Sequence, residues 1–148
     1  MHKSQALKTI RRGLFAGIAG TLVLSVFDRL ERRLLGREPL YAPSRIAARL
    51  AARFGIELSA TAARRAGWAL RAVYGPSLGV AGAWLDPGTG RRTSRACRHG
   101  LAISVFELTV SPLVGAAPPL ARWPLSEVFL LVAHATAFAA GAELASPE

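Results

Sequence analysis

Hydrophobic and polar residues are segregated along the chain into long blocks, and four of these blocks are mostly apolar. The last block, residues 125–144, has 20 mostly apolar and small residues directly after Trp123-Pro124. An α-helix rises about 1.5 Å per residue, so this block would be about 30 Å long, the thickness of the hydrocarbon core of a bilayer. The block before it, residues 99–117, has the same character. Both blocks are therefore predicted to be membrane-spanning helices.

Two further apolar blocks lie earlier in the chain. Residues 13–27 are uncharged and follow a basic leader, and with the charged pair that ends the block the predicted span covers residues 13–29. A basic leader before an apolar run resembles a secretory signal, but no small-x-small cleavage site follows, so we interpret the block as an uncleaved helix. Residues 66–85 carry tryptophan near both ends, as is typical of membrane boundaries. The four blocks predict an all-α, polytopic membrane protein with a four-helix transmembrane bundle, in one domain over residues 1–148.

Between the first two blocks, residues 44–54 have the pattern of a short amphipathic helix. Arginine recurs at every fourth position, at Arg45, Arg49 and Arg53, beside an apolar stripe. Such a helix can lie on an anionic membrane surface with its arginines on the lipid headgroups. The alternative is a helix that packs on the end of the bundle with its arginines in solvent.

Composition and charge support a membrane protein. Hydrophobic residues make up 51% of the chain and aromatic residues only 7%, so the apolar content comes from the small and aliphatic residues that close-packed membrane helices use. The net charge is +10 and the pI is about 11.5, which in a soluble protein would suggest nucleic-acid binding. Here the arginines are concentrated between the apolar blocks and are not interleaved with aromatic residues. We therefore expect anionic lipid headgroups as partners and no nucleic acid.

Small residues recur at helical spacing on three of the predicted spans, and this pattern allows helices to approach closely. The predicted packing positions are Gly13, Gly17, Gly20, Gly75, Gly79, Ala133, Ala137 and Gly141. Four spans of this size make a thin bundle with little interior of its own. The chain is therefore expected to form a homo-oligomer or to join a larger membrane complex.

Two ionisable residues lie in the middle of apolar blocks, Glu107 in residues 99–117 and His134 in residues 125–144. A short proline-rich connection makes these blocks antiparallel neighbours, and the two residues are at matching depth. We expect them to face each other or a shared polar cavity, because an ionised group facing lipid is costly. The pair could relay protons, or it could be a buried hydrogen bond that fixes the helix register.

Sequence signatures of catalysis or metal binding are not found. The chain has no Walker A loop, no GxSxG or HExxH motif, and we identified no acidic pair at helical spacing. His2, His99 and His134 are too dispersed for a recognisable metal site, and the single Cys97 excludes a disulfide framework. The prediction is a protein that is not an enzyme, with no catalytic residues, no cofactor and no metal.

The basic residues do not decide the membrane orientation. With four spans, one side of the membrane would hold eight Lys and Arg residues and the other ten, so the positive-inside rule makes no choice. If residues 13–27 only dip into the membrane, one side would hold 14 Lys and Arg residues and the other four. A three-span topology is therefore the alternative to four spans. We favour four because the glycine-rich face of residues 13–27 suits helix packing.

Residues 67–144 carry an ordered set of motifs. A glycine-spaced block comes first, then an acidic residue upstream of a Pro-x-x-Gly-x-x-Pro-Pro turn, then a Trp-Pro-Leu-Ser helix start and a mid-helix histidine. This set resembles the YagU-like family of small, uncharacterised bacterial inner-membrane proteins. The matching residues are Gly67, Gly75, Gly79, Glu107, Pro112, Gly115, Pro118, Pro119, Trp123, Pro124, Leu125, Ser126 and His134.

The resemblance implies a multi-pass protein of the bacterial inner (cytoplasmic) membrane, and it implies no enzymatic activity. The chain departs from the family pattern at Trp68 and Arg71, where family-like sequences tend to have histidine. It departs again at Ala137-Phe138, where they tend to have an aromatic-glycine pair.

Three functions from different classes follow. The first is a structural or accessory membrane protein, or one related to envelope stress. The second is proton or ion translocation through an oligomer, with Glu107 and His134 as the carriers. The third is a basic helical protein that binds nucleic acid.

Overall fold

The computed structural model describes residues 3–37, 40–85 and 91–146, and over these ranges the protein is all-α, as predicted. The elements in chain order are α1 (Lys3–Leu35), α2 (Pro43–Arg53), α3 (Ala60–Leu85), α4 (Arg92–Leu113), the short 3-10 helix η1 (Leu120–Arg122) and α5 (Leu125–Ala145). Each predicted apolar block lies on one of the four long helices, and the predicted amphipathic helix corresponds to α2.

The helix boundaries differ from the predicted ones at α1, α3 and α4, and α3 begins six residues before the predicted block. Helix α1 extends well beyond residues 13–29, to 33 residues, and Gly36, whose φ is +65°, follows directly after its end. Helix α4 begins seven residues before the predicted block and ends at Leu113, four residues before the predicted end at residue 117. It stops there because Gly115 adopts a left-handed φ of +72°, a conformation that glycine takes at little cost after a helix end.

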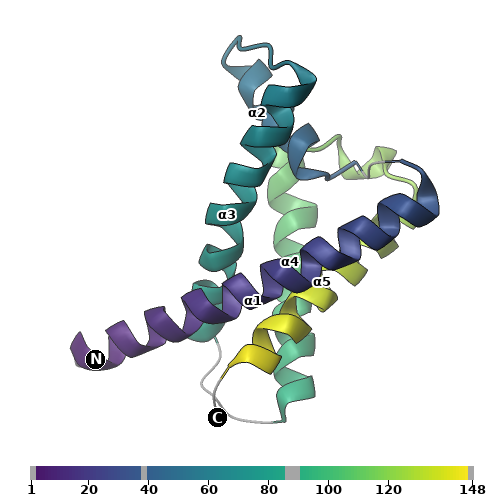
Figure 1. Ribbon diagram of the computed structural model, residues 1–148. Coiled ribbons are helices and arrows are strands. Elements are labelled where there is room, and N and C mark those ends of the chain that lie inside the picture. Colours follow the sequence, from purple (N-terminus) through teal and green to yellow (C-terminus); the bar gives the residue numbers. More distant parts are fainter. Residues whose placement is uncertain (1–2, 38–39, 86–90, 147–148) are drawn as a thin grey trace.

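The helices pack in the order α3, α1, α5, α4, with α2 against α3. Figure 1 shows α1 running obliquely past α3, and α2 at one end of α3. Between α3 and α4 the contacts include two polar ones: the Tyr74 hydroxyl donates to Glu107 Oε1 at 3.2 Å, and His99 Nε2 lies 3.3 Å from the Leu78 carbonyl oxygen. In the described ranges, buried apolar residues form two clusters. One is built mostly of alanines with Ile103 and Phe138, and the other contains Ala117, Trp123 and Leu131.

The contact between α1 and α3 is formed by glycines whose backbones touch. A Cβ added to Gly79 would lie 2.2 Å from the Gly13 carbonyl oxygen, and one added to Gly17 would lie 2.5 Å from the Gly75 carbonyl oxygen. Four of the predicted packing glycines therefore lie at one interface, which we call the glycine seam (Gly13, Gly17, Gly75 and Gly79). The two helices can approach this closely only because these residues lack side chains.

The remaining predicted packing positions concern α5. Gly20 and Gly141 lie where α1 meets α5, since a Cβ on Gly20 would be 2.7 Å from the Phe138 carbonyl oxygen and one on Gly141 would be 2.7 Å from Val23 Cγ2. Ala133 and Ala137 are only half-buried. Helix α5 packs against both α1 and α4, so its most buried face is centred away from these two alanines.

Two helices in the described part of the chain are long and apolar enough to cross a membrane, α1 over Ser4–Leu35 and α5 over Leu125–Ala145. Helix α3 falls short because glycine, proline, serine and Arg71 dilute its apolar residues, and α4 because polar and charged residues do the same. The four-span bundle is therefore not confirmed. Large apolar side chains are nevertheless exposed on all four long helices, among them Phe15, Ile18, Leu22, Val26, Trp68, Val73, Leu101, Val105, Phe129 and Leu144.

Candidate functional site

His134 lies near the middle of α5, is only 6% exposed, and contacts two carboxylates of α1. Its Nε2 is 2.8 Å from Asp28 Oδ1 and 3.0 Å from Glu31 Oε2. Asp28 and Glu31 are three residues apart, so they project from the same face of α1. On the other side of the ring, Nδ1 is 2.7 Å from the Leu130 carbonyl oxygen. A carbonyl can only accept, so Nδ1 carries a hydrogen and Nε2 is the atom that faces the carboxylates.

We call Asp28, Glu31 and His134 the His134 cluster. It continues into α3 through Arg71, whose guanidinium donates to Asp28 Oδ2. Both side chains of this ion pair are largely buried, so it joins α1 to α3 in addition to the glycine seam. Glu31 Oε1 is buried and has no hydrogen-bond partner in the part of the chain that the structure describes.

Aromatic rings surround the histidine. The Phe27 ring meets the imidazole edge-on at a centroid distance of 4.8 Å, and the Tyr41 ring does so at 5.3 Å. The Tyr41 hydroxyl is 3.2 Å from His134 Nδ1, and its ring stacks on Trp123. Burial, and then the nearby carboxylates, raise the pKa of Tyr41, so its hydroxyl stays neutral and available for hydrogen bonding.

Tyr41 is positioned by hydrogen bonds to the segment that joins α1 to α2. Glu127, in the first turn of α5 and 1% exposed, accepts from the Leu40 N–H at 3.0 Å and pairs with Arg37. The hydrogen bond to Glu127 and the negative charge of Glu127 raise the pKa of Arg37. Arg49 of α2 donates to the carbonyl oxygens of Leu40 at 3.2 Å and of Ala116 at 3.0 Å. Leu40, the residue before Tyr41, is thus held by hydrogen bonds to side chains of α2 and α5.

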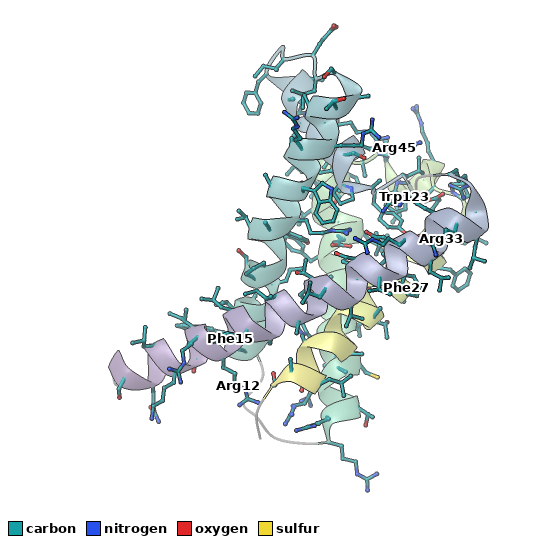
Figure 2. The ribbon with its side chains drawn as sticks, viewed as in Figure 1. Arg12, Phe15, Phe27, Arg33, Arg45 and Trp123 are labelled. Carbon is teal, nitrogen blue, oxygen red and sulfur yellow. The ribbon has the colours of Figure 1, made fainter. Side chains whose placement is uncertain are left out.

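This arrangement bears on the headgroup role predicted for Arg45, Arg49 and Arg53, and it does so differently for each of them. Arg49 is bound to backbone carbonyls, and burial lowers its pKa, so it is not directed at lipid. The Arg53 guanidinium lies at Gly115, where an added Cβ would come within 2.7 Å of its Nε. Arg45 is exposed, at the same end of the bundle as Trp123 (Figure 2). Helix α2 packs on α3, which is the alternative that the sequence left open.

A partly open cavity of about 340 Å³ lies beside the cluster, lined by residues of all five α-helices. Most of its lining is apolar, and its polar residues include Asp28, Glu31, Tyr41, Arg71, Tyr74, Glu107 and His134. Glu107 and His134 therefore line the same cavity, but their partners differ. Glu107 accepts from Tyr74 across the cavity, whereas His134 binds the carboxylates of α1.

A second buried ion pair lies further along α5, away from this cavity. Arg95 Nε of α4 donates to Glu143 Oε2 at 3.0 Å, and both side chains are at least 85% buried. Glu143 of this pair and the neighbouring His99 serve as matched controls for the acids and the histidine of the His134 cluster. They have the same side-chain chemistry at a different place in the fold.

Sequence reasoning missed most of this site. The statement that no acidic pair has helical spacing was wrong, because Asp28 and Glu31 are such a pair. The sequence also indicated no partner for Arg71, which turns inward to Asp28. The signal available was the i, i+3 spacing of the two acids immediately after an apolar block. The sequence indicated no metal site, yet one ligand atom from each residue of the cluster lies within 4.8 Å of the others.

Comparison with protein-family models, with curated proteins and with solved structures found no match for this chain. The resemblance of residues 67–144 to the YagU-like family therefore stays a prediction from motifs.

Glu127 provides a test of how firmly Tyr41 is held. Replacing Glu127 with alanine should lower the free energy of unfolding in detergent by about 1–3 kcal/mol, because the partly buried Leu40 N–H loses its acceptor. Arg37 contributes little to this loss, since its side chain is 50% exposed. The matched change at the exposed Glu57 should alter stability by less than about 0.5 kcal/mol. Equal effects from the two variants, measured by denaturant unfolding, would contradict this assignment.

Proposed function

We propose that the protein is a polytopic membrane protein in which the His134 cluster takes up and releases protons through the adjoining cavity. The observation that carries this proposal is the convergence of three titratable side chains, from α1 and α5, at the wall of a partly open cavity. Ionisable groups inside a membrane bundle are costly to bury, so they usually serve a function. A histidine is suited to proton exchange because its ordinary pKa lies near neutral pH.

The membrane part of the proposal is supported by the outward-facing apolar side chains of the long helices. Phe15, Ile18, Leu22 and Val26 recur along the exposed side of α1, and Phe129 and Val132 along that of α5. In water such a surface would be an aggregation hazard, whereas lipid covers it favourably. We place the protein in the bacterial inner membrane, with anionic headgroups as partners, on the strength of its charge and its motifs.

Membrane integration has a direct test. The full-length chain should remain in the membrane pellet after alkaline carbonate extraction and should enter the supernatant only with detergent. Release by carbonate alone would identify a peripheral or soluble protein and would reopen nucleic-acid binding.

Proton handling is tested by the conservative variants Asp28→Asn and His134→Asn. In proteoliposomes with an imposed pH gradient, each should reduce proton flux at least tenfold, and cells carrying them should survive acid challenge less well. Glu143→Gln is the matched control, because it removes a buried carboxylate away from the cavity. Unchanged flux and survival in folded Asp28 and His134 variants would reject the proton role.

The second candidate function is a structural or accessory membrane protein that self-associates or joins a larger complex. It is favoured by the large exposed apolar area of a bundle with a thin core. In that case the His134 cluster would fix the register of α1 against α5, and its variants would alter stability but neither flux nor acid survival.

A further inference from the structure

We propose that Asp28, Glu31 and His134 bind a divalent first-row transition-metal ion, with a carboxylate oxygen from each acid and Nε2 of the histidine as ligands. These atoms come from two helices and lie within 4.8 Å of one another. The proposal goes beyond proton exchange and does not depend on it, because the cluster can bind the ion whether or not it conducts protons.

The distances within the cluster suit one ion. Zn²⁺ lies about 2.0–2.2 Å from nitrogen and oxygen ligands, so neighbouring ligands of one ion are roughly 3 Å apart. In the cluster, Nε2 is 2.8 Å from Asp28 Oδ1 and 3.0 Å from Glu31 Oε2. The two pairs of atoms that include Nε2 are therefore already at the spacing that one ion requires.

The histidine presents the correct atom. Metal-binding histidines usually donate their second N–H to a carbonyl or carboxylate, which fixes the ring and leaves the other nitrogen as the ligand. His134 has this arrangement, because its Nδ1 is hydrogen-bonded to the Leu130 carbonyl oxygen and its Nε2 faces the two carboxylates. Asp28 is oriented in the same way, since Arg71 holds Oδ2 and leaves Oδ1 directed at the cluster.

An independent indication comes from Glu31. Its side chain is 5% exposed, and Oε1 is fully buried with no hydrogen-bond partner in the described ranges. Buried carboxylate oxygens are almost always satisfied, and an unsatisfied one indicates a missing water or ion. A cation bound at the cluster could take both oxygens of Glu31 and would satisfy this atom.

The charges of the surrounding side chains also favour a cation. With His134 neutral, the cluster carries the two negative charges of Asp28 and Glu31, and Glu107 faces the same cavity. Arg71 balances one of these charges. Two further arginines, Arg32 and Arg64, line the cavity, but both are exposed.

The ligand types select among metals. Imidazole suits Zn²⁺, Fe²⁺, Ni²⁺ and Cu²⁺, whereas Mg²⁺ and Ca²⁺ prefer sites built of oxygen alone. Three protein ligands leave a coordination position open, as in catalytic metal sites. In this protein the cavity lies beside the cluster, so that position is accessible to water or to a small anionic or neutral ligand.

The test uses the full-length chain in detergent, without an affinity tag and after treatment with a chelator. Titration with Co²⁺ should give visible absorption bands at one equivalent per chain, and Zn²⁺ should abolish them. Mg²⁺ at hundredfold excess should leave the cobalt bands unchanged. The dissociation constant for Zn²⁺ follows from the competition.

Glu31→Gln is the decisive variant. It keeps the size of the side chain, and its amide can donate to Nε2 of a neutral His134 or accept from a charged one, so the fold should be retained. Circular dichroism and gel filtration check this. It should weaken Zn²⁺ binding at least tenfold, and His134→Gln should abolish the cobalt bands. The matched controls His99→Gln and Glu143→Gln should leave both measurements unchanged.

Three results would overturn the site. The first is no Zn²⁺ binding by the wild-type protein at millimolar concentration. The second is unchanged affinity in folded Glu31→Gln. The third is an equal loss in His99→Gln, which would indicate adventitious binding to histidines in general. Proton flux in proteoliposomes is measured separately, so a failure of the proton role and a failure of the metal site are distinguishable.

Discussion

Replacing His134 with alanine is expected to lower the free energy of unfolding in detergent by about 3–5 kcal/mol, the range typical of breaking a buried ion pair from one side. The imidazole contacts both Asp28 and Glu31, and the variant leaves Glu31 buried without any described partner. It also removes a ring that packs between Phe27 and Tyr41. Denaturant unfolding followed by circular dichroism measures the loss.

A combined variant separates lost charge pairing from lost packing. When His134→Leu is joined with Glu31→Leu, the buried carboxylate that would be left alone is also removed, while Asp28 keeps its pairing with Arg71. Replacing buried ionic groups with apolar residues of similar size is often neutral or stabilising. The double variant should therefore be more stable than the single variant His134→Leu, which has the same side chain at residue 134 but leaves Glu31 without a described partner. A loss below about 1 kcal/mol in His134→Ala would show that the cluster adds little to stability.

Replacing Gly79 with leucine is expected to disrupt the bundle, with a loss of about 3 kcal/mol or more, because the site has no room even for a methyl group. A Cβ alone would lie 2.2 Å from the Gly13 carbonyl oxygen and 2.4 Å from the Gly17 backbone nitrogen. The neighbouring atoms are backbone and cannot rotate away, so α1 and α3 would have to separate. That separation would also break the contact between Asp28 and Arg71.

Ala81 provides the matched control for this prediction, since it lies two residues further along α3 on the exposed side. Ala81→Leu adds comparable apolar volume where nothing is displaced, and it should change stability by less than about 0.5 kcal/mol. Unfolding in detergent and the amount of folded protein by gel filtration report both variants. Similar behaviour of the two would show that the glycine seam does not set the distance between the helices.

The sequence by itself determined where the helices lie. Apolar blocks of helical length and the amphipathic repeat of residues 44–54 each correspond to a helix, because hydrophobic periodicity is a local property of the chain. The spacing of Gly13, Gly17, Gly75 and Gly79 also identified residues that lie at a close contact. Here the reason is local too, since residues four apart share one face of a helix and glycine alone permits contact between backbones.

The tertiary structure decided which side chains meet. Glu107 and His134 have matching depths on consecutive helices, and that led to the expectation of a pair or a shared cavity. The two residues do line one cavity, but the direct partners of His134 are Asp28 and Glu31, more than 100 residues earlier, because α5 packs on α1 as well as on α4. Arg71 turns inward for the same reason, since the glycine seam brings α3 against α1. Periodicity fixes the face on which a residue lies, but the partner opposite that face depends on how closely, and at what angle, two distant helices cross.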